Sequence, residues 1–382
     1  MEIIYNYTIQ LIRYVLTGDK PELSETIDFE TLYSFAESHG VENMVYAALT
    51  SLGVNVPKET MDKFEEANDM AIANEAMQAL ELEMIGERFE AEGIDYVPLK
   101  GSVIKYLYPD PSYRKSGDID ILIRPEDEKL IDQIMVKLGY ERETEHDDHE
   151  VHFSYRKMPN IEVEVHRQLT RNEDRSAAFF RNPWEYVNLK DGYSHLYQMD
   201  NEYLYVYLLA HLCKHLYLGG AGIRLISDMY IMSGLKYDEA KLNEYLQKAN
   251  LERLRQIVDS LCSCWFGDGT GKESVTEVLE NIVLTGGSFG NKATEEALKV
   301  NDTYDGRVRI LINKVFLSKK EMRHRYAALS DKNYPWIVMW CYRIYYLFKY
   351  KKWIMKQRME ETFSDMDRDK AMTELVTAIR DK

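Results

Sequence analysis

Cysteine is scarce in this chain, with four among 382 residues: Cys213, Cys262, Cys264 and Cys341. Their spacing fits no zinc-binding pattern, and Cys262 and Cys264 are too close together for ordinary ligation or bridging. So few thiols exclude a disulfide scaffold and predict reduced cysteines in a cytoplasmic protein. The first residues contain no basic segment followed by an apolar run, so we expect no secretory signal there.

Basic residues are also under-represented, since 48 Lys and Arg face 64 Asp and Glu, for a net charge of −16. Because polyanion binding needs basic surface, we expect no extended DNA binding, although one local basic patch or a small acceptor is compatible with this charge. The aromatic stretch 336–348 is interrupted by Arg343 and is too short for an integral membrane segment. It fits a buried helix followed by lysines, or alternatively a peripheral membrane helix.

Two aspartates stand two residues apart in the β-branched stretch 117–123, as Asp118 and Asp120. This composition predicts a strand, in which such residues point to the same face. The two carboxylates would lie about 6–7 Å apart by the rise of a strand, and they repel each other unless a cation lies between them. Oxygen ligands of this kind suit Mg²⁺ or Mn²⁺. The alternative is a strand end with two solvated acids.

A turn that can hold a phosphate precedes these aspartates. Gly101 and Ser102 follow the short apolar stretch 94–99 and precede the segment 103–108, which has helical character. Glycine permits close backbone approach, serine donates a hydroxyl, and a helix start offers free amides. Lys100 flanks this turn and can neutralise charge on a bound phosphate.

A third acidic position comes from the strictly alternating segment 161–166, which predicts a half-buried strand. Glu162, Glu164 and His166 share its polar face. If this strand pairs near the two aspartates, a third carboxylate joins them, and three carboxylates can hold two divalent ions. Glu162 and Glu164 both lie on the face that could supply this third metal ligand. The alternative to a metal site is an exposed sheet face that carries three polar residues.

Together these motifs resemble the polymerase-beta-like nucleotidyltransferase superfamily, and within it a bacterial branch of largely uncharacterised nucleotidyltransferases with a helical continuation. The motifs that carry the resemblance lie between about residues 97 and 167: Leu99-Lys100-Gly101-Ser102, Tyr108, Arg114, the stretch 117–123 and Glu164-Val165-His166. The branch usually has aspartate where this chain has Glu164.

The resemblance implies the transfer of a nucleoside monophosphate from a nucleoside triphosphate to a hydroxyl or amino acceptor, with release of pyrophosphate. It implies that Asp118, Asp120 and Glu164 are catalytic and hold two Mg²⁺ or Mn²⁺ ions, and it adds Arg114 as a nucleotide contact beside Lys100. Gly101 and Ser102 would hold the β- and γ-phosphates. The acceptor, a small molecule, sugar, tRNA or protein, stays open. The alternatives are a catalytically silent nucleotide-binding module and a peripheral membrane protein.

Two histidines stand four residues apart in an apolar segment, as His211 and His215, and so share one helical face. A metal pair is possible, but no acid lies between them as in a metalloprotease helix. Members of the resembled branch often have histidines and a following aspartate on such helices, matched here by Asp228. We expect these residues to pack in the core or to contact substrate.

Hydrophobic periodicity predicts an α+β fold in three parts. Residues 1–93 read as an N-terminal helical region, with a long helix from Phe64 that ends at Gly93. Residues 94–190 have a mixed pattern with a hairpin around Pro159-Asn160, and the resemblance implies that they form a small nucleotidyltransferase core with a mixed or antiparallel sheet. Residues 191–382 would form a C-terminal helical domain.

Overall fold

The computed structural model describes residues 1–22, 26–143, 150–172, 174–217, 220–269, 272–287 and 374–379. The chain divides into two units, Met1–Glu295 with Leu375–Lys382 and Glu296–Glu374, and all described residues except Glu374 belong to the first. The aromatic stretch 336–348 lies outside the described residues. Among the described helices, none is long and apolar enough to cross a membrane.

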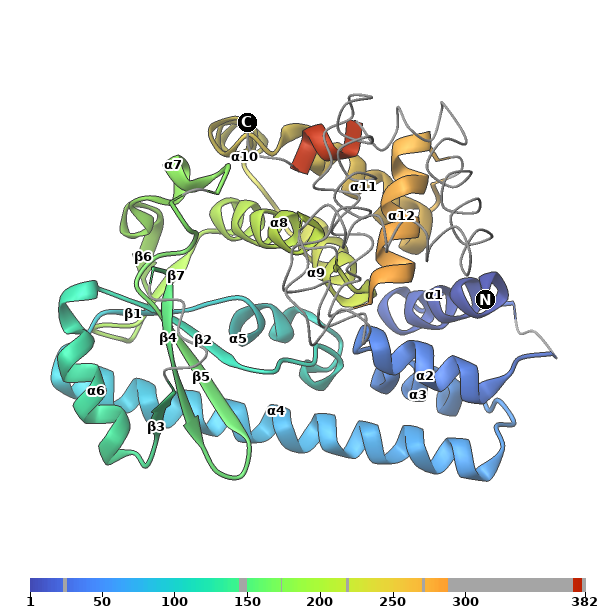
Figure 1. Cartoon of the computed structure of the whole chain (residues 1–382), viewed down its shortest axis with the longest axis horizontal. Helices are drawn as coiled ribbons and strands as arrows, with labels where there is room; N and C mark the ends of the chain where they lie inside the picture. Colours follow the sequence, from blue (N-terminus) through green and yellow to red (C-terminus); the bar gives the residue numbers. More distant parts are fainter. Residues whose placement is uncertain are drawn as a thin grey trace, which may run out of the picture. The chain divides into compact units, whose positions relative to one another are not determined.

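The N-terminal part is helical, as predicted (Figure 1). Its helices are α1 (Glu2–Thr17), α2 (Phe29–His39), α3 (Glu42–Ser51) and α4 (Lys58–Glu92). Gly93 ends α4 with φ 74°, a left-handed conformation that glycine adopts without a Cβ clash. The predicted end of this helix is therefore confirmed. It begins at Lys58 rather than Phe64, directly after Pro57, whose fixed φ suits a helix start.

The following part contains a five-stranded mixed sheet in the order β1-β2-β5-β4-β3. Its strands are β1 (Tyr96–Pro98), β2 (Ile119–Ile123), β3 (Glu141–Glu143), β4 (His152–Lys157) and β5 (Ile161–His166). Strands β2 and β5 run parallel, whereas the other neighbouring pairs are antiparallel. The predicted hairpin of β4 and β5 is confirmed.

Alternation along these strands separates an apolar face from a polar face. Ile119, Ile121 and Ile123 of β2 pack in one core with alternate residues of β4 and β5 and with side chains of α4 and α6 (Glu128–Lys137). Asp120 and Glu164 occupy the other parity and point away from this core. The period-two pattern of the sequence thus determines which side chains reach the polar face.

Short elements connect the sheet to the helices around it. They are α5 (Gly101–Ile104), η1 (Lys105–Leu107), η2 (Pro111–Tyr113), η3 (Pro125–Asp127), α7 (Ala177–Phe180), η4 (Pro183–Tyr186) and the antiparallel pair β6 (Val187–Leu189) and β7 (Tyr197–Met199). The predicted helix after the Gly-Ser turn is a single turn of α-helix followed by a 3₁₀ turn.

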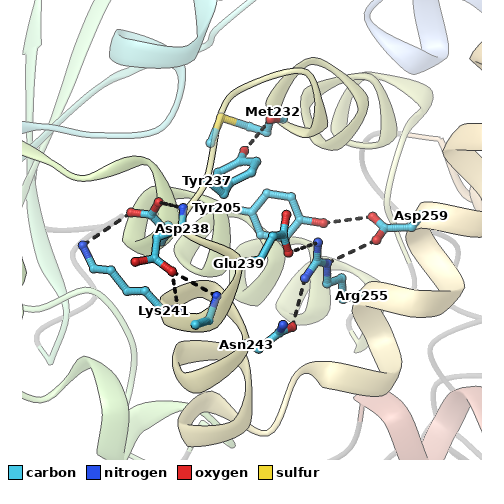
Figure 2. A network of polar contacts seen from close by, with 11 residues as sticks. Tyr205, Met232, Tyr237, Asp238, Glu239, Lys241, Asn243, Arg255 and Asp259 are labelled. Carbon is cyan, nitrogen blue, oxygen red and sulfur yellow. Dashed lines mark hydrogen bonds and ion pairs between the residues drawn. The ribbon is translucent and has the colours of Figure 1, made fainter.

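From Asn201 the described chain is helical again, as predicted. The helices are α8 (Asn201–Tyr217), α9 (Ile223–Ser233), α10 (Glu239–Ala249), α11 (Glu252–Phe266) and α12 (Ser274–Gly286). Figure 2 shows polar contacts that join three of them. Asp259 of α11 accepts hydrogen bonds from Tyr205 of α8 and from Arg255, and Arg255 also reaches Asn243 of α10. The fold is therefore α+β, a mixed sheet flanked by helical regions.

Candidate active site

Strands β2 and β5 bring three carboxylates together on the polar face of the sheet. Asp118 directly precedes β2, Asp120 lies within it, and Glu164 is the partner of Asp120 in the parallel register. One oxygen from each of the three lies within 4.8 Å of the others. Asp118 precedes the strand rather than lying inside it, which allows a closer approach than two positions along a regular strand.

Glu162 lies two residues before Glu164 on the same strand but belongs to neither possible metal-ligating group among the described residues. Its carboxylate lies 3.9 Å from the guanidinium of Arg156. The register therefore places Glu164, and not Glu162, beside the aspartates. That Glu164 is a metal ligand stays a prediction.

The side chains of Lys100 and His166 converge on Asp120. The Lys100 ammonium donates to its Oδ1 at 2.6 Å and lies 3.9 Å from Glu164 Oε2. His166 Nε2 lies 2.8 Å from the same Oδ1 and 3.4 Å from Glu164 Oε2. Lys100 was expected beside a triphosphate, and the structure turns it toward the carboxylates. His166, which the sequence placed on the same polar face as Glu164, lies in direct contact with Asp120.

The charges of this cluster shift the pKa values of the two aspartates in opposite directions. The charge of Asp120, together with burial, raises the pKa of Asp118 to about 7. Burial opposes ionisation of Asp120, but Lys100 and His166 hold its pKa below the usual range. One of the two carboxyls therefore keeps a proton near neutral pH unless further positive charge is supplied. The three oxygen donors, of which Asp120 is buried and the other two are partly exposed, fit a divalent cation such as Mg²⁺ or Mn²⁺.

The turn before α5 is tightly built. Lys100 has φ 44°, in the left-handed region that side chains rarely adopt, and this turn directs its ammonium to Asp120. A Cβ on Gly101 would lie 2.4 Å from Ser116 Oγ and 2.7 Å from Arg114 Nη1, so the close packing there requires glycine. Such strain and crowding are typical of functional sites.

Two of the amides expected to be free at this helix start have backbone partners. The backbone amide of Ser102 donates to Leu99, and those of Val103 and Ile104 donate to Lys100. The expectation was therefore wrong for Ser102 and Val103, whose amides close tight turns at the start of α5. The roles of Gly101 and Ser102 as phosphate contacts stay predictions, and they would depend on the Ser102 hydroxyl more than on backbone amides.

Arg114 forms a buried pair with Asp228 of α9. Its Nε and Nη2 donate to the two carboxylate oxygens at 3.2 and 2.9 Å, and the Tyr108 hydroxyl donates to Oδ1 at 2.8 Å. Arg114 and Asp228 are 5% and 2% exposed. The pair links the segment before β2 to the C-terminal helices. A nucleotide contact by Arg114 stays a prediction, whereas its contact with Asp228 is a connection that the sequence did not reveal.

Helix α8 brings Tyr207 and His211 within the electrostatic influence of Asp120, and His215 follows one turn later. Burial raises the pKa of Tyr207, with Lys100 and the carboxylates among the charges that act on it. Its hydroxyl is buried and has no hydrogen-bond partner among the described residues. One turn further, His211 Nε2 lies 3.1 Å from His215 Nε2. Burial lowers the pKa of both rings, to about 4 for His215, so both are neutral at pH 7.

Arg224 of α9 is a second side chain near the carboxylates that the sequence did not single out. Burial, followed by the charge of Arg114, lowers its pKa to about 10, while Asp228 and Asp118 act in the opposite direction. Arg224 is therefore a cation at neutral pH. A helical signal was present in the sequence, because Arg224 and Tyr207 each precede an identified residue, Asp228 and His211, by one turn.

A cavity of about 1200 Å³ opens beside the Gly-Ser turn. Ser102 and Tyr106 line it together with side chains of α4, β1 and β7, and most of its lining is apolar or aromatic. Its size and its mixture of aromatic and polar groups are those of a small-molecule site.

Comparison with known proteins agrees with this geometry. A family model described as "Uncharacterised nucleotidyltransferase" matches residues 25–267, which include every strand of the sheet and helices α8 to α11. No curated protein and no solved structure gave a significant match. Because the family match covers well over half of the 382 residues and contains the acidic site, the protein belongs to this family of nucleotidyltransferases.

Proposed function

We propose that this protein is a Mg²⁺- or Mn²⁺-dependent enzyme that transfers a nucleoside monophosphate from a nucleoside triphosphate to a hydroxyl or amino acceptor. The observation that supports this most is the convergence of Asp118, Asp120 and Glu164 within 4.8 Å on one face of the sheet. Family membership supports nucleotidyl transfer in general. The metal dependence and the acceptor class are our proposal.

In the proposed reaction, an acceptor oxygen attacks the α-phosphorus, the bond to the β-phosphate oxygen breaks, and pyrophosphate leaves. Divalent cations, when bound by the three carboxylates, would stabilise the attacking and leaving oxygens. Burial opposes ionisation of Glu164, but its hydrogen bond with His166 lowers its pKa. Glu164 is therefore ionised at neutral pH, and its carboxylate can accept the proton that the acceptor loses.

Positive side chains would stabilise the pyrophosphate. Burial opposes the charge of Lys100, but Asp120 raises its pKa, so the ammonium is retained next to the carboxylates. Arg224 contributes a second fixed cation from α9. Cations held in place before the reaction stabilise developing negative charge without reorganisation. The acceptor would be recognised by residues of the helical parts.

A nucleotide-binding experiment tests the proposal without knowledge of the acceptor. Titration calorimetry of the full chain with ATP, GTP, CTP and UTP is carried out with Mg²⁺ and with EDTA. We expect binding that requires Mg²⁺ and that falls at least about 100-fold in Asp118→Asn, since metal coordination contributes several kcal/mol.

Glu162→Gln is the matched control, because it removes a carboxylate from the same face of β5 outside the cluster, and it should bind as the wild type does. Equal Mg²⁺-dependent binding by Asp118→Asn and Glu162→Gln would contradict the proposed site. Transfer is then sought with α-labelled nucleotide and pooled sugars, small molecules, tRNA and proteins. Tight binding without any transfer would instead support the silent nucleotide-binding module.

A further inference from the structure

A second set of ligand-type side chains lies beside the three carboxylates. His152 of β4 is the direct antiparallel partner of His166 of β5, and their ring centroids lie 5.1 Å apart. Glu164 precedes His166 by two positions, so its carboxylate projects from the same face. Two imidazoles and one carboxylate therefore meet on adjacent strands, held by the register of the sheet.

The distances in this set suit a metal ion. His152 Nε2 lies 3.4 Å from Glu164 Oε1, and His166 Nε2 lies 3.4 Å from Glu164 Oε2. Ligands bound at about 2.0–2.2 Å in a tetrahedral site lie roughly 3.4 Å from each other. One ligand atom from each of the three residues lies within 4.8 Å of the others.

The buried histidine faces both carboxylates with the same nitrogen. His166 is 2% exposed, and its Nε2 lies 3.4 Å from Glu164 Oε2 and 2.8 Å from Asp120 Oδ1. Its Nδ1 is buried without a hydrogen-bond partner among the described residues, so Nε2 is the nitrogen that would bind the ion. The His152 and Glu164 side chains are 14% and 20% exposed, which leaves an ion a route from solvent.

We propose that His152, Glu164 and His166 bind one divalent transition-metal ion of the Zn²⁺ class. Imidazole nitrogens favour Zn²⁺, Fe²⁺ or Ni²⁺ over Mg²⁺, which prefers oxygen ligands. This site differs in chemistry from the all-carboxylate cluster, although the two share Glu164. It does not depend on nucleotidyl transfer, since binding of the ion can be measured with the protein alone.

Binding of Zn²⁺ and Co²⁺ to the EDTA-treated full chain tests this site. Zn²⁺ is followed by calorimetry, and Co²⁺ by the visible absorption bands that nitrogen ligands shift and intensify. We expect wild-type protein to bind Co²⁺ with a spectrum that indicates imidazole ligation. His152→Ala should weaken Zn²⁺ binding at least about tenfold and remove that spectrum, because it deletes a direct ligand.

Two variants make the comparison specific. His195→Ala removes a part-exposed histidine that pairs with Asp95 elsewhere, and it should leave Zn²⁺ affinity and the Co²⁺ spectrum unchanged. Asp118→Asn should retain the Co²⁺ spectrum, because Asp118 lies outside this ligand set, while it loses Mg²⁺-dependent nucleotide binding. The two proposals can therefore fail separately.

Absence of imidazole-type Co²⁺ bands in the wild type would overturn this inference. So would an unchanged spectrum in His152→Ala. Circular dichroism shows whether that variant is folded, and His152→Gln, which preserves much of the side-chain volume, replaces it if it is not. Loss of the Co²⁺ spectrum in Asp118→Asn alone would place the ion among the carboxylates and contradict the histidine site.

Discussion

The two sides of the candidate site differ in how they carry charge. On the sheet, Asp118, Asp120 and Glu164 are close together, and Lys100 and His166 offset their charge through direct contacts. On the helices, the histidines of α8 are neutral, and Arg224 of α9 is a cation near Asp118. The sheet side is thus suited to hold cations, whereas the helical side offers a neutral surface and positive charge to a phosphate.

This difference follows from the backbone. A strand places carboxylates at fixed spacing on one face, and its neighbour places another directly opposite, so a metal site is determined by register. A helix presents side chains one turn apart along a stripe, which suits an extended ligand better than a single ion. We therefore propose metal chemistry for the sheet and substrate contacts for α8 and α9.

The largest loss of stability is expected from a variant that breaks the contact between the sheet side and the helical side of the site. Arg114→Ala leaves Asp228 buried without its partner, and loss of one member of a buried ion pair costs about 3–5 kcal/mol of unfolding free energy. Urea denaturation followed by circular dichroism measures this loss. Lys58→Ala, which removes an exposed pair with Asp62, should change the same quantity by less than about 0.5 kcal/mol. Similar losses in both variants would contradict a buried, linking role for Arg114.

A change of pH should have a smaller effect on the free energy of unfolding, because helices α2 and α8 contain buried histidines that are neutral in the folded chain. Burial lowers the pKa of His39 to about 4, and the pKa values of His211 and His215 are lowered for the same reason. The unfolded chain binds these protons from about pH 6.5 downward and the folded chain does not. Stability should therefore fall between about pH 6.5 and pH 4, by on the order of 1 kcal/mol per histidine.

Urea midpoints at pH 7.5, 6.5 and 5.0 measure this decline. His39→Gln keeps a polar side chain of similar length and should reduce the slope below pH 6.5 without changing it above pH 7. A slope that is the same in His39→Gln and the wild type would show that this ring does not contribute.

The smallest effect on stability is expected from two tyrosines of α8, whose variants can be compared directly. The hydroxyls of Tyr203 and Tyr207 are both buried without a hydrogen-bond partner among the described residues. Tyr203 packs among aromatic rings such as Tyr186, whereas Tyr207 lies near the carboxylates. Removing an unsatisfied buried hydroxyl should leave stability unchanged or raise it by up to about 1 kcal/mol in both Phe variants.

Nucleotide binding and transfer should differ between the two variants. We expect Tyr207→Phe to weaken Mg²⁺-dependent nucleotide binding or transfer at least about tenfold, and Tyr203→Phe to leave both unchanged. Calorimetry and the labelled transfer assay give the two readings. Equal behaviour of Tyr203→Phe and Tyr207→Phe would remove Tyr207 from the site and weaken the assignment of substrate contacts to α8.

Local pattern was enough to predict much of the sheet side. The Asp-x-Asp spacing, the alternation in 161–166 and the hairpin around Pro159 fix which side chains share a face, because strand parity is a property of adjacent residues. Parity could not decide between Glu162 and Glu164. That choice depends on the register between β2 and β5, whose residues are about forty positions apart.

The helical side was predicted less completely. The histidines of α8 were identified, but Tyr207 and Arg224 were not. Each lies one turn before an identified residue, His211 or Asp228, but this spacing alone does not show what the side chain faces. Lys100 was assigned to phosphate because the sequence shows that it is near the turn. Its direction depends on a left-handed backbone conformation that only the folded chain reveals.

The Arg114–Asp228 contact also has an evolutionary consequence. The two residues are 114 positions apart, yet each is destabilising without the other, so a single substitution at either position meets a barrier that a paired exchange avoids. Among relatives of this chain, positions 114 and 228 should change together or not at all. Substitutions at these two positions would therefore be inherited as a pair. Sequence change in the helical part would in this way be linked to sequence change in the segment that precedes β2.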